Sequence, residues 1–163
     1  MKISTMLLSA VFMGFLFADS RAGERLQTEF FPQRHHYLKG KWKTRHMTKG
    51  GTQDGLITAR LRDIELRLQI PVTYTVPPQA VSIYLVLPTQ IPGMRGAAGF
   101  EVSWKTRKIF WAGTARPGDR VLLYQGTVSS AVLSDFVSFK LTIDSAEMIG
   151  AIDFEPSYEI ERR

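Results

Sequence analysis

The stretch "DIELRLQIPVTYTV", residues 63–76, alternates polar and apolar side chains without interruption. Its apolar positions are Ile64, Leu66, Leu68, Ile70, Val72, Tyr74 and Val76. Successive side chains of a β-strand point to opposite faces, so the alternation predicts strand structure with one buried face. Pro71 lacks a backbone donor, and we therefore predict two short strands joined by a bend at Pro71.

The same two-residue period recurs along the rest of the chain. It marks residues 80–87, 100–104, 107–113, 119–128 and 134–143. Segments rich in Gly, Pro and Asp separate these stretches, as expected of turns. Strands that recur about every 8 to 12 residues, without a convincing helix between them, are typical of an antiparallel sandwich or barrel. We predict an all-β fold in a single domain.

The first 22 residues have the order of a secretory signal peptide. Lys2 precedes an apolar run from Met6 to Ala18, and small residues follow at Ser20 and Ala22. The run of about 13 apolar residues is shorter than the roughly 20 that cross a bilayer as a helix. We predict cleavage after Ala22, with Ser20 as the alternative. The mature domain, residues 23–163, is expected in the periplasm or at the cell surface, without a transmembrane span.

The amino-acid composition indicates where the protein acts and what kind of partner it can bind. The 163 residues include no Cys and carry a formal net charge of +6. An exported chain without disulfides is more typical of a bacterial envelope than of disulfide-stapled secreted scaffolds. A basic balance permits binding to anionic surfaces such as lipopolysaccharide or acidic glycans. Nucleic acid is the less plausible partner of an exported protein.

Positive charge is concentrated in residues 34–49, which hold six Lys or Arg and no acidic residue. On a strand, one face of this segment would present Lys39, Lys41, Lys43 and Arg45. These four residues are our candidates for an anion-facing surface, and the alternative is an ordinary solvated face. The histidines, His35, His36 and His46, do not make a metal site because the adjacent pair would point to opposite faces and no Cys completes a ligand set.

Catalytic motifs are absent from the sequence. It contains no G-x-S-x-G, no H-E-x-x-H, no glycine-rich phosphate loop followed by a helix and no Cys nucleophile. The carboxylates of Asp153 and Glu155 share one face of a predicted strand, but solvated acidic residues are commoner there than an acid and base pair. We predict a protein that is not an enzyme and has no cofactor.

Polar and apolar residues also alternate at both ends of the mature chain. In "GERLQTEFF", residues 23–31, the alternating positions are Leu26, Thr28 and Phe30. Such a segment can be the first strand of its own fold, or it can add to the sheet edge of a neighbour as a donor strand. In "AIDFEPSYEIERR", residues 151–163, the apolar positions are Ile152, Phe154, Tyr158 and Ile160. Pro156 favours a place at a sheet edge, and these four residues are our candidates for the acceptor edge.

These features together resemble the subunits of chaperone–usher fimbriae. The stretch "LRLQIPVTYTVPPQAVSIYLVLP", residues 66–88, is similar to the part of such subunits in which two strands flank a proline-rich turn. The resemblance implies an immunoglobulin-like antiparallel β-sandwich that lacks one strand and an N-terminal extension, residues 23–33, that fills the groove of a neighbour. The implied partners are copies of the chain or other fimbrial subunits, a periplasmic chaperone and an outer-membrane usher, and the implied role is structural or adhesive.

A second class of function also fits the sequence. It is a self-contained periplasmic β-sandwich that binds an anionic ligand, such as a host or envelope glycan, or an envelope assembly partner.

Overall fold

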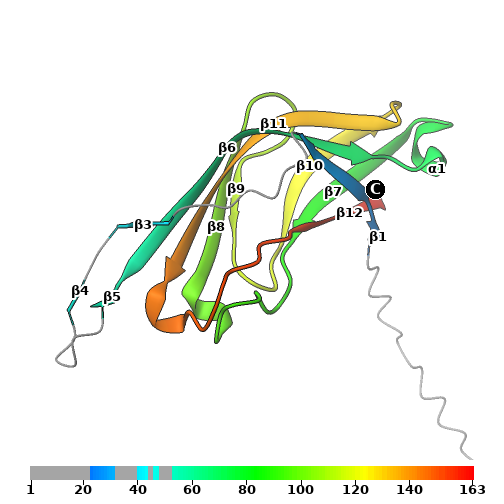
Figure 1. Ribbon diagram of the computed structural model, residues 1–163. Coiled ribbons are helices and arrows are strands. Elements are labelled where there is room, and N and C mark those ends of the chain that lie inside the picture. The colour runs from blue at the N-terminus through cyan, green and yellow to red at the C-terminus, as the bar shows by residue number, and fades with distance from the viewer. Residues whose placement is uncertain (1–22, 32–39, 44–45, 48–52) are drawn as a thin grey trace, which may run out of the picture.

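A computed structural model describes residues 23–31, 40–43, 46–47 and 53–163. The predicted signal peptide, residues 1–22, lies outside the described residues. The chain forms two antiparallel sheets that pack face to face (Figure 1), which confirms the predicted all-β sandwich. None of the helices among the described residues is long and apolar enough to cross a membrane.

The first sheet, called sheet A, has the strand order β1-β12-β7-β10. Its strands are β1 (Glu24–Arg25), β12 (Ser157–Arg162), β7 (Gln79–Val86) and β10 (Arg120–Val128). Sheet B has the order β2-β6-β11-β8-β9, and β3 also pairs with β6. Its strands are β2 (Gln27–Phe31), β6 (Leu56–Gln69), β11 (Val132–Asp144), β8 (Phe100–Thr106), β9 (Gly113–Ala115) and β3 (Lys41–Trp42).

The remaining elements are short. A small hairpin pairs β4 (His46–Met47) with β5 (Gln53–Asp54). The helical turns are α1 (Val72–Thr75), η1 (Ala97–Gly99) and η2 (Ser145–Glu147).

Strand β6 changes its buried phase at a β-bulge. Before the bulge, Ala59 and Leu61 face the other sheet, whereas after it the inward residues begin at Ile64. The register with β11 shifts at this point, and Asp63 takes a left-handed backbone conformation with φ of 53°. Asp tolerates this conformation better than most residues. A bulge adds one residue to a strand, so the alternation shifts by one residue while the same side of the strand stays buried before and after it. Arg62 and Asp63 therefore both stay on the outer face.

The residues after Pro71 do not form the second strand that the alternation predicts. Val72–Thr75 is one helical turn, in which the Val76 amide donates to the Val72 carbonyl at 3.0 Å. Proline is compatible with the start of a helix because its missing donor has no partner there. Tyr74 points into the core, but Val72 and Val76 are 68% and 72% exposed. The prediction of a second strand is therefore wrong. Apolar and polar residues still alternate after Pro71, but the backbone of these residues forms hydrogen bonds within one turn and not with a neighbouring strand.

The core lies between the sheets and is rich in aromatic residues. Phe154 packs against Phe100 and Phe139, with ring centroids 5.8 and 5.7 Å apart. Phe110 is buried and its neighbour Trp111 is 47% exposed.

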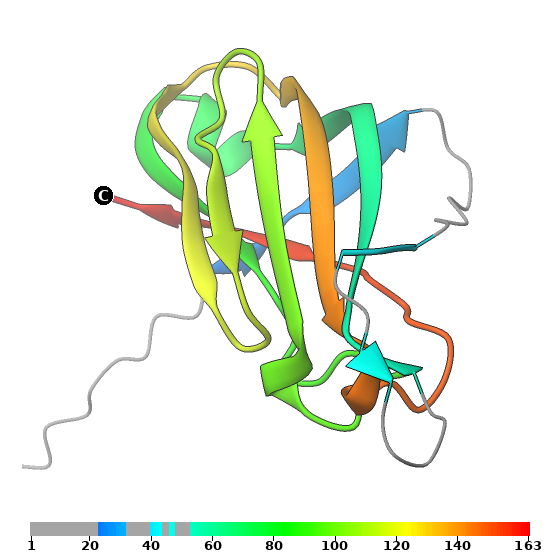
Figure 2. The ribbon, with the colours of Figure 1, turned by 90° about the vertical axis from the view of Figure 1, so that its left-hand side faces the viewer.

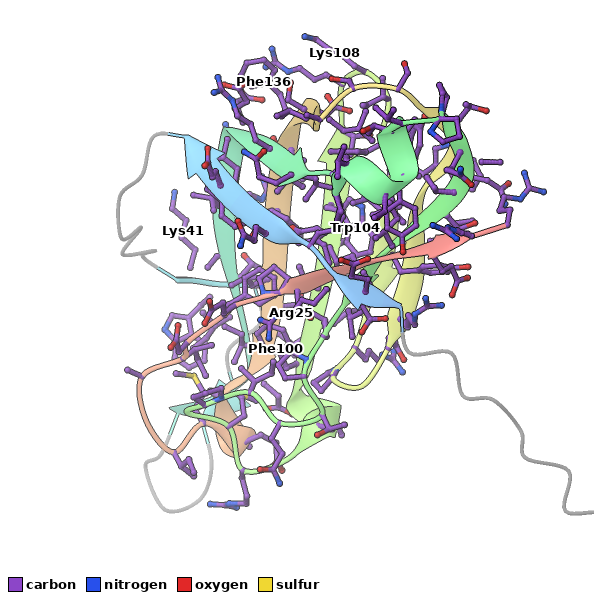
Figure 3. All side chains as sticks on the ribbon, turned by 90° about the vertical axis from the view of Figure 1, so that its right-hand side faces the viewer. Arg25, Lys41, Phe100, Trp104, Lys108 and Phe136 are labelled. Atoms are coloured by element: carbon purple, nitrogen blue, oxygen red, sulfur yellow. The ribbon has the colours of Figure 1, made fainter. Side chains whose placement is uncertain are left out.

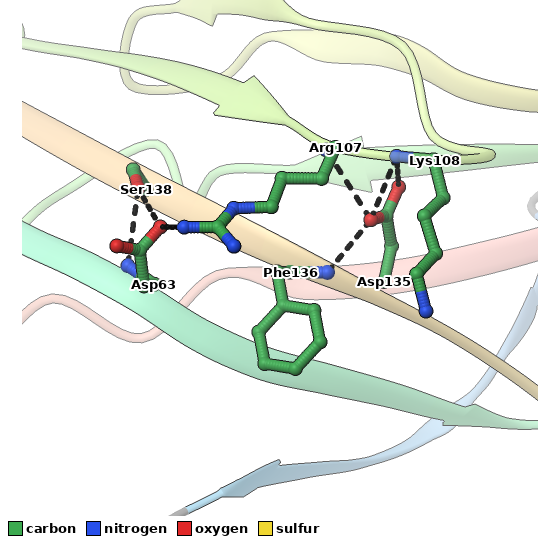
Figure 4. Close-up of polar contacts among 6 residues, drawn as sticks. All are labelled: Asp63, Arg107, Lys108, Asp135, Phe136 and Ser138. Atoms are coloured by element: carbon green, nitrogen blue, oxygen red, sulfur yellow. Dashed lines mark hydrogen bonds and ion pairs between the residues drawn. The ribbon is translucent and has the colours of Figure 1, made fainter.

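One buried carboxylate, that of Asp135, holds the turn between β8 and β9 (Figure 4). Asp135 accepts backbone hydrogen bonds of 2.7 to 3.3 Å from Arg107, Lys108, Ile109, Phe110 and Phe136. Burial opposes ionisation of this carboxylate, but the amide hydrogen bonds outweigh that effect and hold the pKa of Asp135 below its usual range. The turn thus depends on a charged side chain in the core.

We predict that Asp135→Asn lowers the free energy of unfolding by about 3 kcal/mol, because an amide group replaces one of the two acceptor oxygens with a donor. The lowered pKa means that the contribution of Asp135 is complete above the unfolded pKa of about 3.9 and is lost as the pH falls below it. Urea unfolding between pH 3 and 7 measures both effects.

Asp153→Asn is the matched control, since Asp153 is exposed. This variant should stay within about 0.5 kcal/mol of the parent chain. Equal effects of the two substitutions would contradict the role given to Asp135.

Candidate functional site

The N-terminal segment contributes to both sheets of its own fold. Glu24 in β1 pairs with Ile160 in β12, whereas Gln27 in β2 pairs with Gln69 in β6. The change of sheet occurs at Leu26, whose amide donates to the Tyr158 carbonyl at 2.8 Å and whose side chain is buried. In this structure, therefore, the segment that was predicted as a donor strand pairs within its own chain.

A groove opens where β2 and the C-terminal segment separate. Figure 3 shows β1 lying beside β12, and β2 and residues 151–157 diverging from that point. The groove has a volume of about 1440 Å³. Pockets for small ligands span roughly 300–1,000 Å³, so this groove has the size for a longer occupant.

Apolar side chains form the floor of the groove, and apolar and polar side chains alternate on its walls. The floor consists of inward-facing residues of sheet B, and the walls come from β2 and from residues 151–157. The apolar lining residues are Leu26, Phe30, Trp42, Ile57, Ala59, Leu61, Ile64, Phe139, Leu141, Ile143, Met148, Ala151, Ile152, Phe154 and Pro156. Phe30, Leu61 and Phe154 are only partly buried. The hydrophobic core is thus accessible to an apolar occupant at this place.

The backbone around the groove has unused hydrogen-bonding capacity. Within the part of the chain that the structure describes, the amides of Ile152, Phe154 and Glu155 have no hydrogen-bond partner, whereas Asp153 donates to the Pro92 carbonyl. On the opposite wall β2 is an edge strand, and residues 59–64 of β6 have no strand partner on that side among the described residues. Open backbone edges of this kind accept an added strand.

Pro156 sets the boundary between open and paired backbone. It is buried and has no amide donor, and β12 begins at the next residue, Ser157. From there Tyr158 and Ile160 are fully buried between the sheets. Strand β12 is not an edge strand at Ile160, because β1 of the same chain pairs with it there.

The predicted assembly residues therefore gather around one site. Leu26, Thr28 and Phe30 line the groove on one side, and Ile152 and Phe154 line it on the other. The floor residues were not found from the sequence. Their alternation in β6 and β11 could have identified them as inward-facing, but not as exposed to a groove.

The acidic residues near the C-terminus have a partner in their own sheet. Arg120 forms ion pairs with Glu159 at 3.0 Å and with Glu161 at 2.9 Å. Its guanidinium lies 3.4 Å from the ring centroid of Tyr84, whose hydroxyl donates to Glu161. Glu159 and Glu161 are therefore neutralised by a cation of a neighbouring position in their own sheet.

The anion-facing candidates are only partly described. Lys41 lies in β3 opposite Thr58 of β6, and both Lys41 and Lys43 are exposed. Lys39 and Arg45 lie outside the described residues.

Comparisons with known proteins give no assignment. No protein-family model, no curated protein and no solved structure matches the chain.

The Tyr158 hydroxyl is buried and has no hydrogen-bond partner among the described residues. Burial raises the pKa of Tyr158 well above its usual range. We predict that Tyr158→Phe raises the free energy of unfolding by about 1 kcal/mol, because it removes a polar group that lost its hydration without gaining a bond. Tyr84→Phe, which loses the bond to Glu161, should lower the free energy of unfolding by about 1 kcal/mol. Denaturant unfolding of both variants measures the difference, and a loss of stability in Tyr158→Phe would contradict this account.

Proposed function

We propose that the protein is an exported, non-enzymatic structural or adhesive subunit that assembles by strand addition. The observation that carries the proposal is the apolar groove between β2 and residues 151–157. Strand addition combines backbone hydrogen bonds, which supply affinity, with pockets for alternate side chains, which supply specificity. Backbone groups without partners and space for apolar side chains lie next to one another along the groove.

The proposed occupant is the N-terminal segment of a neighbouring subunit. Leu26, Thr28 and Phe30 present alternating side chains, and in the isolated chain they already lie against this groove. Exchange of such an element between identical copies replaces the pairing of β1 with β12 by the same pairing between chains, so it costs little free energy. In this proposal the exchanged strand then continues along residues 152–155, whose free amides it pairs, instead of crossing to β6. Withdrawal of β1 and β2 would also uncover β12, which makes Tyr158 and Ile160 part of the receiving edge.

Export belongs to the same proposal. The signal peptide predicted at residues 1–22 and the absence of Cys support assembly in the periplasm or at the cell surface. A periplasmic chaperone and an outer-membrane usher are the proposed assembly partners, on the basis of the resemblance to fimbrial subunits.

A disulfide between β1 and β12 tests the exchange directly, since the chain has no natural Cys. Arg25 and Glu159 are directly opposite one another, and the Cα separation of about 4.5 to 5.5 Å in such pairs suits a disulfide. We predict that Arg25→Cys/Glu159→Cys stays monomeric when it is oxidised before assembly and assembles after reduction. Oxidation after assembly should give a covalent ladder on a non-reducing gel.

The control pair is Ala80→Cys/Thr127→Cys, which joins β7 to β10 at another cross-strand pair. Neither of these strands is exchanged, so this disulfide should form within each copy, leave assembly unchanged and give no ladder. Disulfides that form only within single chains for Arg25→Cys/Glu159→Cys, at every protein concentration, would contradict the proposal.

A further inference from the structure

A second surface lies on the outer face of sheet B, on the opposite side of the sheet from the groove. Figure 2 shows this face, with β6, β11 and β8 side by side. Five basic residues from four neighbouring strands project from it: Lys41, Arg60, Arg62, Lys105 and Lys140. We call these five residues the basic face.

The strand register brings the members of the basic face together. Lys140 is directly opposite Arg60, and Lys41 is directly opposite Thr58, two residues before Arg60. Side chains that are directly opposite on neighbouring strands have Cβ atoms about 4.5 to 5.5 Å apart. The bulge at Asp63 keeps Arg62 on this face as well. Like charges at such separations repel one another, so their collection here favours an anionic occupant.

No acidic residue neutralises the basic face within the part of the chain that the structure describes. Two carboxylates on the same side of the sheet, those of Asp63 and Glu101, already have other partners. Asp63 forms an ion pair with Arg107 at 2.7 Å, and Glu101 forms one with Arg116 at 3.3 Å. Neither arginine belongs to the basic face, so its five charges remain available to a ligand.

One part of the basic face is hollowed. A cavity of about 330 Å³ is lined by Lys41, Thr58, Arg60 and Arg62. Three cationic side chains and one hydroxyl thus surround a space that can receive a single anionic group. Lys140 and Lys105 continue the positive charge across β11 and β8, beyond the cavity.

The residues between the cations indicate the class of ligand. Ser103 is directly opposite Lys140, and Thr142 follows Lys140 by two residues on the same side of β11. The hydroxyls of both residues can bond to sugar hydroxyls. Binding of single-stranded nucleic acid relies on aromatic side chains that stack with bases, and binding to a membrane surface relies on apolar side chains that insert. The surroundings of Arg60 and Lys140 have neither kind of residue. Phe136, four residues before Lys140 on the same side of β11, is partly buried and has Arg107 and Lys108 each 5.6 Å from its ring centroid. A linear polymer with recurring acidic groups matches positive charges that are spread over four strands.

We propose that the basic face binds an anionic polysaccharide, with one sulfate or carboxylate group in the cavity beside Arg60 and Arg62. The cations of β3, β6, β11 and β8 then meet successive acidic groups of the same chain. This inference does not depend on strand addition, because the basic face and the groove lie on opposite sides of sheet B.

The experiment compares two variants of the full chain with the same net charge. Arg60→Gln/Lys140→Gln removes two neighbouring cations of the basic face, and Arg95→Gln/Arg163→Gln removes two exposed cations elsewhere. Affinity is measured for a size-defined heparin oligosaccharide and for polygalacturonate, and in parallel for phosphatidylglycerol vesicles. We expect the first variant to bind at least one of the two polysaccharides about tenfold more weakly than the parent chain, because two charge-assisted contacts are lost. The second variant should bind within about twofold of the parent chain, since charges away from the ligand act only through screened solvent.

Three results would overturn the proposal. Equal losses in the two variants would show that net charge alone attracts the polymer. Binding to vesicles but to neither polysaccharide would identify a lipid surface as the ligand. No saturable binding to any of the three probes would show that the basic face is a solvated surface. Circular dichroism of both variants verifies that the fold is retained, and Arg62→Gln provides a second, milder test in the cavity.

Discussion

The structure depends on the backbone hydrogen bond from Leu26 to Tyr158, where the N-terminal segment passes from one sheet to the other. Before this point the segment completes sheet A, and after it the segment completes sheet B. One strand cannot follow two diverging sheet edges. Residues 151–156 consequently have no strand neighbour among the described residues, and a groove into the core remains. The proposed assembly follows from this geometric conflict.

Sheet B separates the two proposed activities. Its inner face supplies the apolar floor of the groove, through residues such as Leu61 and Phe139. Its outer face carries the cations Arg60 and Lys140. The bulge at Asp63 maintains this separation, because it restores the inward phase of β6 while it leaves the charged residues outside. A subunit joined to its neighbours through the groove would therefore still present the basic face.

Much of the fold could be predicted from the sequence, because alternation reports directly which strand faces are buried. The prediction from alternation failed where the backbone does not continue as a regular strand. These places are the Asp63 bulge and Val72–Thr75, where local hydrogen bonds replace a strand. The buried Asp135 carried a usable signal, since it shares the inward phase of Val137 and Phe139. The groove and the basic face depend on cross-strand register, as between Arg60 and Lys140, which one strand's pattern does not contain.

Amide hydrogen exchange at residues 152–155 tests the central claim, that the groove receives a strand, most directly. In the monomer the amides of Phe154 and Glu155 should exchange rapidly, because they have no partner among the described residues. In assembled protein their exchange should slow by roughly tenfold or more, while Ser129 and Ser130 in the β10–β11 turn keep their rates. Unchanged exchange at Phe154 and Glu155 in the assembled protein, or a chain that stays monomeric with its N-terminal segment intact, would contradict the claim.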